Sequence, residues 1–583
     1  MIAAGLTDWR WCNELTAPLP ARYEISVISR YTTKYQSDSV AANVWLRRIM
    51  QKIYRVKMPL HAIGSDDTAR SWAAEYHRLR YTTSKNTVVL IDELPERYQW
   101  LKAYAEKAGF VAPYSEAKEI SRHQLQLAVN KLDCEKWWQR QAKTTAARCR
   151  EYIAIALGLV NARAEPYISR EALTVWKKNQ EQAAAFLAEN WIGLETETGS
   201  GFADMEAITL AEASAAGTAN PEIRRLEMMA RIRGIEEAAK AAGMAGVFLT
   251  WTAPSAYHYN SGKRWNGCDP RDTQRYLANQ WKKCRAELAE QEITFSGLRV
   301  VEPHNDETPH WHLLIFVKPE QKAAFLAMCR RYAMQHDSAE AGAEQHRFKV
   351  EEIDPAKGSA VGYIAKYISK SINGAKCENL TDDDTGEALT DTAEKCRAWA
   401  SVWGIRQFQF VGVPSVTIWR ELRRIREPLT CEQTEAIRAA ADNGQFCNFI
   451  QLMGGLGAKR KDYPLTTIKQ ATLSPAGTLK EKIAGLLVGG GALILTRKNW
   501  VSLGRMGASF ERFSELLQGA SRAAWTRENN CKSAEKMAEL AERGNQKLNL
   551  LQQARRAVVG YINAAGEFMQ EFFTDYGEPE PIN

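Results

Sequence analysis

Two histidines separated by one residue, His310 and His312, are the first sign of chemistry in this sequence. They begin the segment 310–317, whose nearly continuous apolar character predicts a strand that is buried on both faces. In a strand, residues i and i+2 project from the same face about 6.6 Å apart. The two imidazoles therefore point the same way and can bind one metal ion.

A carboxylate from the preceding segment can complete this site. Residues 298–302 predict a strand that ends in Glu302, and residues 304–309 predict a tight loop. If the two strands pair as a hairpin, Glu302 lies beside the histidines. Two imidazole nitrogens and one carboxylate oxygen leave positions open for water and a phosphate oxygen, which suits Mg²⁺ or Mn²⁺. The residues alone leave three rival third ligands open: His304, Asp306 and Glu307.

A predicted helix over residues 359–372 carries the second group of candidate residues. Tyr363 and Tyr367 are four residues apart, so their hydroxyls emerge from one face, one turn apart. Isoleucines at the same spacing supply the buried side, and lysines form a basic row beside the tyrosines. These residues are Ile364, Ile368, Ile372, Lys366 and Lys370. An amphipathic helix whose tyrosines only cover the edge of the core explains this spacing equally well.

Together the two groups indicate the transfer of a DNA phosphate to tyrosine. A tyrosine hydroxyl, with an ordinary pKa of about 10, is a poor nucleophile unless a cation stabilises the phenolate or polarises its target. A metal held by Glu302, His310 and His312 can polarise the phosphate, and a nearby lysine can offset the developing charge. The attack gives a 5′-phosphotyrosine and a free 3′-hydroxyl without ATP. A second tyrosine can then cut again while the first still holds its strand.

Three motifs, in order along the chain, carry a resemblance to a known family. They are 248–252 (FLTWT), 302–312 (EPHNDETPHWH) and 363–367 (YIAKY). Further matches lie at residues 220–225, 270–274 and 403–408. Over roughly residues 220–426 the chain resembles the replication gene A proteins of temperate tailed phages, which are two-tyrosine members of the HUH endonucleases.

The resemblance implies roles for the candidate residues. Tyr363 and Tyr367 are expected to be the nucleophiles, and His310 and His312 are expected to bind the divalent ion, Mg²⁺ or Mn²⁺. Glu302 stands eight residues before the first histidine and is the preferred third ligand by this comparison. The basic row of Lys366 and Lys370 is expected to contact DNA.

The resemblance also implies an activity and a set of partners. The protein is expected to nick one strand of origin DNA at a single-stranded or supercoiled site and later to rejoin that strand. The freed 3′-end would prime rolling-circle replication by the polymerase of the host. The segment 454–461 is basic and rich in glycine but lacks the spacing and the Ser/Thr of a P-loop, so a separate host helicase is expected. The place of action would be the cytoplasm of the host bacterium.

The predicted fold class is α+β. A length of 583 residues favours about two to four domains. Residues 1–192 predict a mainly helical domain of unknown role, and residues 193–219, rich in Gly, Ser, Thr and Ala, predict a linker. Residues 220–426 would form the endonuclease domain, and residues 427–583 a mixed and helical region. The resemblance implies an antiparallel sheet with helices on one face, and the metal and DNA on the other. The strand near residue 248 would pair with the histidine strand, and residues 407–410 would form an edge strand.

Composition and cysteine spacing exclude several other classes. The net charge of +8 is modest, so any DNA-binding surface must be local. Eleven scattered cysteines without a C-x-x-C pair exclude a zinc ribbon and argue against a disulfide framework. The N-terminus has no apolar signal segment, and the longest apolar run, 483–495, is too short to span a bilayer. No membrane partner is expected.

Other proteins with an H-x-H motif fit less well. A histidine-triad hydrolase needs a third histidine where Leu314 stands, and a cupin needs a carboxylate soon afterwards. The alternative from another class is a non-catalytic protein that binds origin or single-stranded DNA. Its stacking and phosphate-binding residues would include Trp137, Trp138, Arg140 and Lys143, although burial of both tryptophans in a core is the simpler explanation.

Overall fold

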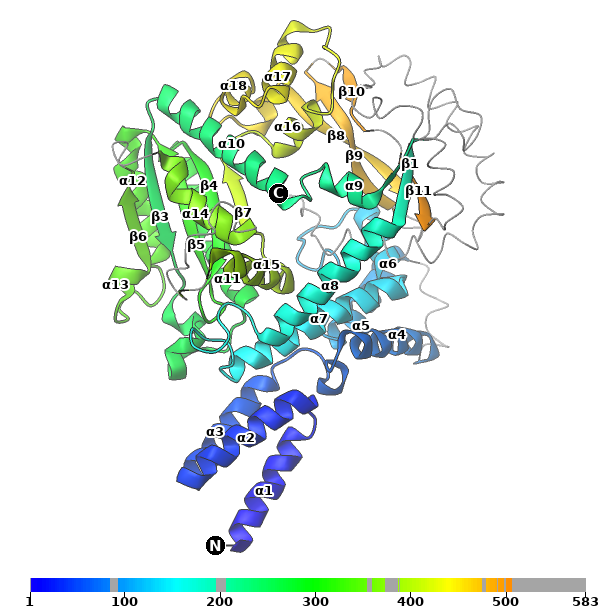
Figure 1. Ribbon diagram of the computed structural model, residues 1–583, viewed down its shortest axis with the longest axis vertical. Coiled ribbons are helices and arrows are strands. Elements are labelled where there is room, and N and C mark those ends of the chain that lie inside the picture. Colours follow the sequence, from blue (N-terminus) through cyan, green and yellow to red (C-terminus); the bar gives the residue numbers. More distant parts are fainter. Residues whose placement is uncertain are drawn as a thin grey trace.

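The computed structural model describes residues 2–83, 93–194, 206–353, 359–372, 386, 388–473, 479–489, 491–497 and 500–505. Within these residues, helices combine with three antiparallel sheets, as the α+β class requires (Figure 1). The sequence pattern within the predicted C-terminal region also favours helices over 510–518 and 533–557, and both segments lie outside the described residues.

The first third of the chain is helical, as the sequence predicts. Its helices are α1 (Ile2–Thr16), α2 (Ala21–Ser37), α3 (Ser39–Ile53), α4 (Asp66–Thr83), α5 (Leu94–Lys107), α6 (Arg122–Asp133), α7 (Glu135–Ala156) and α8 (Arg170–Glu189). Helices α1–α3 project away from the rest of the molecule (Figure 1). Trp137 and Trp138 are buried in an aromatic core formed with α4 and α5. Neither ring is exposed for stacking on DNA.

A five-stranded sheet of order β6-β3-β5-β4-β7 organises the middle of the chain. Its strands are β3 (Ala245–Trp251), β4 (Phe295–Pro303), β5 (Pro309–Val317), β6 (Phe348–Glu352) and β7 (Phe408–Val411). The predicted hairpin is confirmed, because β4 pairs with β5 in antiparallel register and Glu302 lies opposite His310. The predicted pairing of β3 with β5 and the edge position of β7 are also confirmed.

Helices cover both faces of this sheet, so the expectation of helices on one face only is wrong. One face packs against α11 (Pro270–Glu290), α12 (Pro319–Ala333) and α15 (Leu389–Trp403). The opposite face packs against α10 (Pro221–Ala241) and α14 (Ala360–Ile372). The physical reason lies in β5, which is buried along its whole length and therefore needs cover on both sides.

Helices α10 and α14 have ends and faces that the sequence explains. Asn220 caps α10 by accepting a hydrogen bond from the Glu222 backbone, and proline occupies the first turn. The predicted buried stripe of α14 is confirmed, because Ile364, Ile368 and Ile372 all lie in the core. Glu236 of α10 accepts backbone hydrogen bonds from the first turn of α14, so the two helices are joined directly.

The remaining elements connect the sheet region to both ends of the described chain. They are β1 (Asn190–Leu194), β2 (Glu206–Thr209), α9 (Leu210–Ala215), α16 (Val416–Leu422), α17 (Glu432–Asp442), α18 (Phe446–Leu452), β8 (Leu465–Leu473), β9 (Leu479–Val488), β10 (Leu493–Leu495) and β11 (Trp500–Arg505). Strand β2 and helix α9 occupy part of the interval 193–219, which was predicted as a linker. Strand β11 pairs with β1, which brings two distant parts of the sequence together.

The core around α10 continues past residue 426. Phe446 and Phe449 of α18 share this core with Ile232 of α10 and Leu314 of β5. The helices cross closely at Gly234, where an added Cβ would lie 2.6 Å from the Cβ of Phe446. The division of the chain into domains stays a prediction, and the residue 426/427 boundary falls within one packed core.

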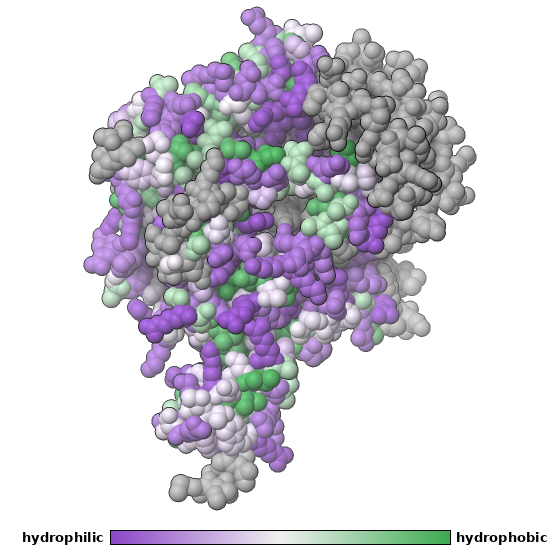
Figure 2. Space-filling model, viewed as in Figure 1, coloured by the Kyte–Doolittle hydropathy of each residue, from purple (hydrophilic) through white to green (hydrophobic). Residues whose placement is uncertain are grey.

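The outer surface is largely hydrophilic on the face shown in Figure 2, with hydrophobic residues scattered among polar ones. Among the described residues, no helix combines the length and the apolar character that crossing a membrane requires.

Candidate active site

Three buried side chains converge at the end of the β4–β5 hairpin. Within the described residues, Glu302, His310 and His312 form the one group of potential ligands whose donor atoms all lie within 4.8 Å of one another. His310 and His312 project from one face of β5, as the strand period predicts. Their Nε2 atoms are 2.9 Å apart. Glu302 reaches the same point because its position in β4 is directly opposite His310.

The chemistry of these three side chains fits a divalent cation. Burial lowers the pKa of His312 to about 3, and burial together with neighbouring His304 holds the pKa of His310 well below its usual value. Both imidazoles are therefore neutral at neutral pH, as metal binding requires. Two adjacent ligands about 2.1 Å from one ion lie about 3 Å apart, which agrees with the separation of the two nitrogens.

Neighbouring side chains hold these ligands in place. The Thr250 hydroxyl on β3 lies 3.2 Å from Nδ1 of His312. Ser371 donates a hydrogen bond of 3.3 Å to Oε1 of Glu302, and the ammonium of Lys370 lies 3.6 Å from Oε2. Hydrogen bonds of this kind fix the tautomer and orientation of a ligand. Thr250 was not predicted, because its role depends on the register of β3 against β5.

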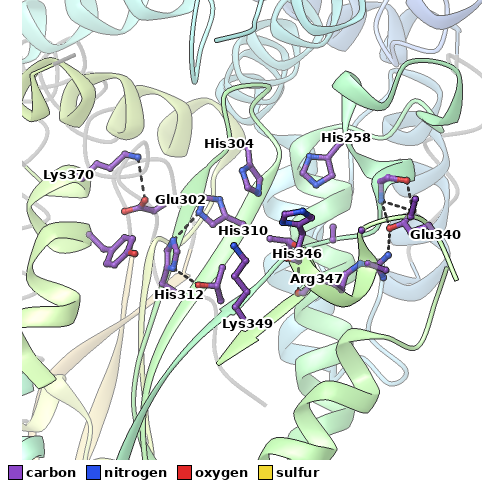
Figure 3. Close-up of a pocket in the computed structure, with 18 of the residues that line it drawn as sticks. His258, Glu302, His304, His310, His312, Glu340, His346, Arg347, Lys349 and Lys370 are labelled. Atoms are coloured by element: carbon purple, nitrogen blue, oxygen red, sulfur yellow. Dashed lines mark hydrogen bonds and ion pairs between the residues drawn. The ribbon is translucent and has the colours of Figure 1, made fainter. Parts of the chain in front are cut away.

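The rival third ligands, His304 and Asp306, lie outside this group. The His304 ring stacks on His310 with centroids 4.0 Å apart, and Asp306 lies 3.5 Å from Nδ1 of His258. Burial lowers the pKa of His304 to about 3, with a further contribution from His258. Figure 3 shows the rings of His312, His310, His304 and His258 following one another across the pocket.

The third rival, Glu307, is anchored on the other side of the loop. Trp399 donates to its backbone carbonyl at 3.0 Å, and Trp403 donates to its carboxyl group at 2.6 Å. Burial raises the pKa of Glu307 well above its usual value, and the nearby Glu151 carboxylate raises it further. A neutral, fully buried carboxylic acid suits a structural role in the loop better than metal binding.

Tyr367 lies directly against the candidate metal ligands. Its ring centroid is 4.0 Å from that of His312 and 5.4 Å from that of Phe248. Tyr367 also lines the pocket that contains the three ligands. Tyr363, one turn earlier on α14, packs near Phe248 at 6.4 Å and is absent from that lining. The two predicted nucleophiles therefore occupy different positions relative to the ligands.

The pocket has a volume of about 500 Å³ and extends beyond the candidate metal ligands (Figure 3). Its lining carries four basic side chains, Arg347, Lys349, Lys366 and Lys370, together with the carboxylates of Glu302 and Glu340. Arg347 is buried and paired with Glu340, whereas Lys349 is exposed at the edge strand β6. A volume of this size lies within the range of ordinary ligand pockets.

The two predicted DNA-binding lysines differ in their surroundings. Lys366 is half-buried and lines the pocket beside Tyr367. Lys370 is buried, and besides Glu302 its ammonium lies 3.3 Å from the hydroxyl of Tyr167. Tyr167 belongs to the N-terminal helical region and was not predicted, because no local pattern marks a residue so distant in the sequence. DNA contact by either lysine stays a prediction.

Comparisons with known proteins place the chain in a family. The family model of the bacteriophage replication gene A protein (GPA) matches residues 64–375, more than half of the chain. The probable replication protein P12 of Pseudoalteromonas phage PM2 is 42% identical over 452 residues, covering 76% of this chain and 67% of that protein. The replication gene A protein of Escherichia phage 186 is 36% identical over 471 residues, covering 76% and 66% respectively.

A third relative carries a more specific name. A probable replication endonuclease from a prophage-like region of Salmonella typhimurium is 32% identical, covering 69% of this chain and 52% of that protein. The chain thus spans roughly half to two thirds of the length of these relatives. No solved structure matches it. The matched family model and the high identity to the phage PM2 protein show that this chain belongs to the bacteriophage replication gene A protein family.

Proposed function

We propose that this protein starts phage DNA replication by nicking one strand of origin DNA with a tyrosine nucleophile. The observation that carries the proposal is the contact of Tyr367 with His312 in the pocket that also holds Glu302 and His310. The relatives named replication proteins and replication endonucleases support the same function.

The proposed reaction exchanges one phosphate ester for another. The hydroxyl oxygen of Tyr367 forms a bond to the phosphorus, and the bond between phosphorus and the 3′-oxygen breaks. The proton lost by the phenol passes through water to that oxygen. The products are a 5′-phosphotyrosine and a free 3′-hydroxyl, so the ester energy is kept and the strand can be rejoined by the reverse attack.

Residues of this chain would position the phosphate for this attack. Glu302, His310 and His312 would hold Mg²⁺ or Mn²⁺, which when bound supplies Lewis-acid polarisation of the phosphate oxygens. Lys366 lines the pocket beside Tyr367 and would offset the negative charge that develops on the phosphate.

We propose that Tyr367 attacks first and Tyr363 second. The ring of Tyr367 contacts that of His312, a candidate ligand, whereas Tyr363 lies one helical turn away near Phe248. A second cut or the rejoining step would bring Tyr363 into use while Tyr367 holds its strand. The cooperating partners would be a host helicase and the replicative polymerase in the host cytoplasm. A separate helicase is proposed because the glycine-rich segment 454–461 lacks the spacing of a P-loop.

The test is formation of a covalent protein–DNA adduct with single-stranded or supercoiled origin DNA and Mn²⁺. The adduct is read as a protease-sensitive band under denaturing conditions. Tyr363→Phe combined with Tyr367→Phe should abolish it while leaving DNA affinity within about threefold, because only two hydroxyls are removed. Tyr54→Phe, which alters an exposed tyrosine on the projecting helices, is the matched control.

Two outcomes would contradict the proposal. An adduct formed by the double variant would locate the nucleophile elsewhere. A wild-type chain that binds origin DNA but yields no adduct with either substrate would favour the non-catalytic DNA-binding alternative. Mass spectrometry of the adduct would identify the phosphotyrosyl peptide.

A further inference from the structure

Tyr167 reaches the candidate active site from the N-terminal helical region. It lies in the loop between α7 and α8 and is fully buried. Its hydroxyl is 3.3 Å from the ammonium of Lys370, and its ring centroid lies 4.8 Å from the same nitrogen. Lys370 therefore contacts both the polar edge and the face of this ring.

Lys370 connects Tyr167 to the candidate metal ligands. Its ammonium is 3.6 Å from Oε2 of Glu302, and Lys370 lines the pocket whereas Tyr167 is absent from that lining. The contact that leads from Tyr167 towards these ligands is thus the one with Lys370.

A lysine in this position needs restraint. Its four-carbon chain is flexible, and a divalent cation held by Glu302 would repel the ammonium. A hydrogen bond to a charged donor and a cation–π contact each favour one position of that donor. Tyr167 supplies both contacts.

The backbone of Tyr167 is itself held in an unusual conformation. Its φ of +72° lies in the left-handed region, which residues with a side chain rarely adopt. Two residues later, Ser169 donates two hydrogen bonds to Glu151 of α7, at 2.6 Å from its backbone and 2.5 Å from its hydroxyl. Such strain persists only where the surroundings fix the conformation, and in this conformation the ring contacts Lys370.

We propose that Tyr167 is a positioning residue that holds the Lys370 ammonium beside Glu302, where it can act on the scissile phosphate. The inference rests on the proposed nicking function and extends it. The N-terminal helical region then completes the active site instead of serving only as an attached domain.

The primary test is Tyr167→Phe, which keeps the ring and removes the hydroxyl. The single-turnover rate of adduct formation should fall about tenfold, because one charge-assisted hydrogen bond is lost. DNA affinity should stay within about threefold, since Tyr167 does not line the pocket. Tyr98→Phe is the matched control, because Tyr98 is equally buried and donates to the Pro113 carbonyl at 2.7 Å. Its rate should equal that of the wild type.

A double-mutant cycle separates positioning from general stability. Lys370→Met should lower the rate by itself, and adding Tyr167→Phe to it should cause no further loss. A second readout, acetylation of Lys370 by a small reagent followed by mass spectrometry, should accelerate in Tyr167→Phe and stay unchanged in Tyr98→Phe. Both results would support the inference.

The contrary outcomes are distinguishable. A wild-type adduct together with an unaffected Tyr167→Phe rate, or with fully additive losses in the cycle, would overturn this inference and leave the proposed function intact. A wild-type chain that forms no adduct would overturn the proposed function and, with it, this inference.

Discussion

The two faces of the five-stranded sheet are made from the same strands but have different contents. On the face toward α11, Trp251, Trp311 and Leu313 are buried in an apolar core. On the opposite face, the same strands present His310 and His312 to a pocket. Side chains alternate along a strand, so one residue lies in the apolar core and the next faces the pocket. A slip of one residue in the strand register would therefore exchange the core residues with the pocket residues.

The chemical face is itself divided along the strands. Near α10 it is apolar, and Leu314 and Phe316 share one core with Ile232. Two residues before Leu314, it becomes polar at His312. The apolar half packs against α14, and the polar half lies beside Tyr367 of the same helix. Helix α14 is thus packed against the core on one side and lines the pocket on another.

The largest expected effect comes from removing the candidate ligands on the chemical face. His310→Ala with His312→Ala should abolish Mn²⁺ binding measured by calorimetry and lower adduct formation about a thousandfold, since metal assistance supplies several kcal/mol. The metal-free variant should stay folded by circular dichroism, because the apolar core of the other face is unchanged. Retained Mn²⁺ binding would show that the ion is held elsewhere.

The next effect probes the apolar face. Trp311→Ala should lower the free energy of unfolding by about 3–5 kcal/mol, because Trp311 is fully buried and would leave a cavity. Urea unfolding measures this change. At a temperature where the variant is folded, Mn²⁺ affinity should stay near the wild-type value. Loss of Mn²⁺ affinity in the folded variant would mean that the two faces are not separable.

The third prediction concerns acid sensitivity of the metal-free protein. The pKa of His312 and His304 is about 3 in the folded chain, against an ordinary value of about 6.5. Between these values the unfolded chain binds protons that the folded chain does not. Stability should therefore fall as pH decreases from 6.5 towards 3, by about 1 kcal/mol per pH unit for each group.

Urea unfolding at several pH values tests this slope. His312→Gln should make it shallower, whereas His123→Gln, at an exposed position in α6, should leave it unchanged. An identical slope in the wild type and His312→Gln would show that His312 is not held neutral by the fold.

The smallest effect concerns the support of one ligand. Thr250→Val keeps the shape of the side chain but removes the hydroxyl beside Nδ1 of His312. Mn²⁺ affinity should fall about tenfold, as expected for the loss of a hydrogen bond that orients a ligand. Thr252→Val, also at the pocket, is the control, because the Thr252 hydroxyl bonds to the His346 carbonyl instead. Equal affinities for the two variants would contradict this role of Thr250.

The sequence predicts the parts of this site that depend on local patterns. Alternation along 310–317 and the short loop before it place His310, His312 and Glu302 together, because a hairpin with a tight loop has a defined register. The helical period likewise predicts the buried and tyrosine-bearing sides of α14.

Other features have no local signal. Tyr167 meets Lys370 only because α7 and α8 pack beside the sheet region, and Thr250 meets His312 only through strand pairing. Helices cover both faces of the sheet because β5 is buried on both sides. The apolar run 310–317 predicted this burial, whereas the family resemblance implied helices on one face only. Contacts between segments far apart in the sequence depend on the whole packing arrangement and leave no period to detect.

The pairing of β1 with β11 has a practical consequence for anyone who shortens this protein. Strand β1 is the middle strand of its sheet, between β2 and β11. A recombinant fragment that ends after α14 would lack β11. The amide and carbonyl groups of β1 that pair with β11 would then have no hydrogen-bond partner. Such bare edges recruit other chains into aggregates. Soluble fragments should therefore extend beyond residue 505, well past every residue of the proposed chemistry.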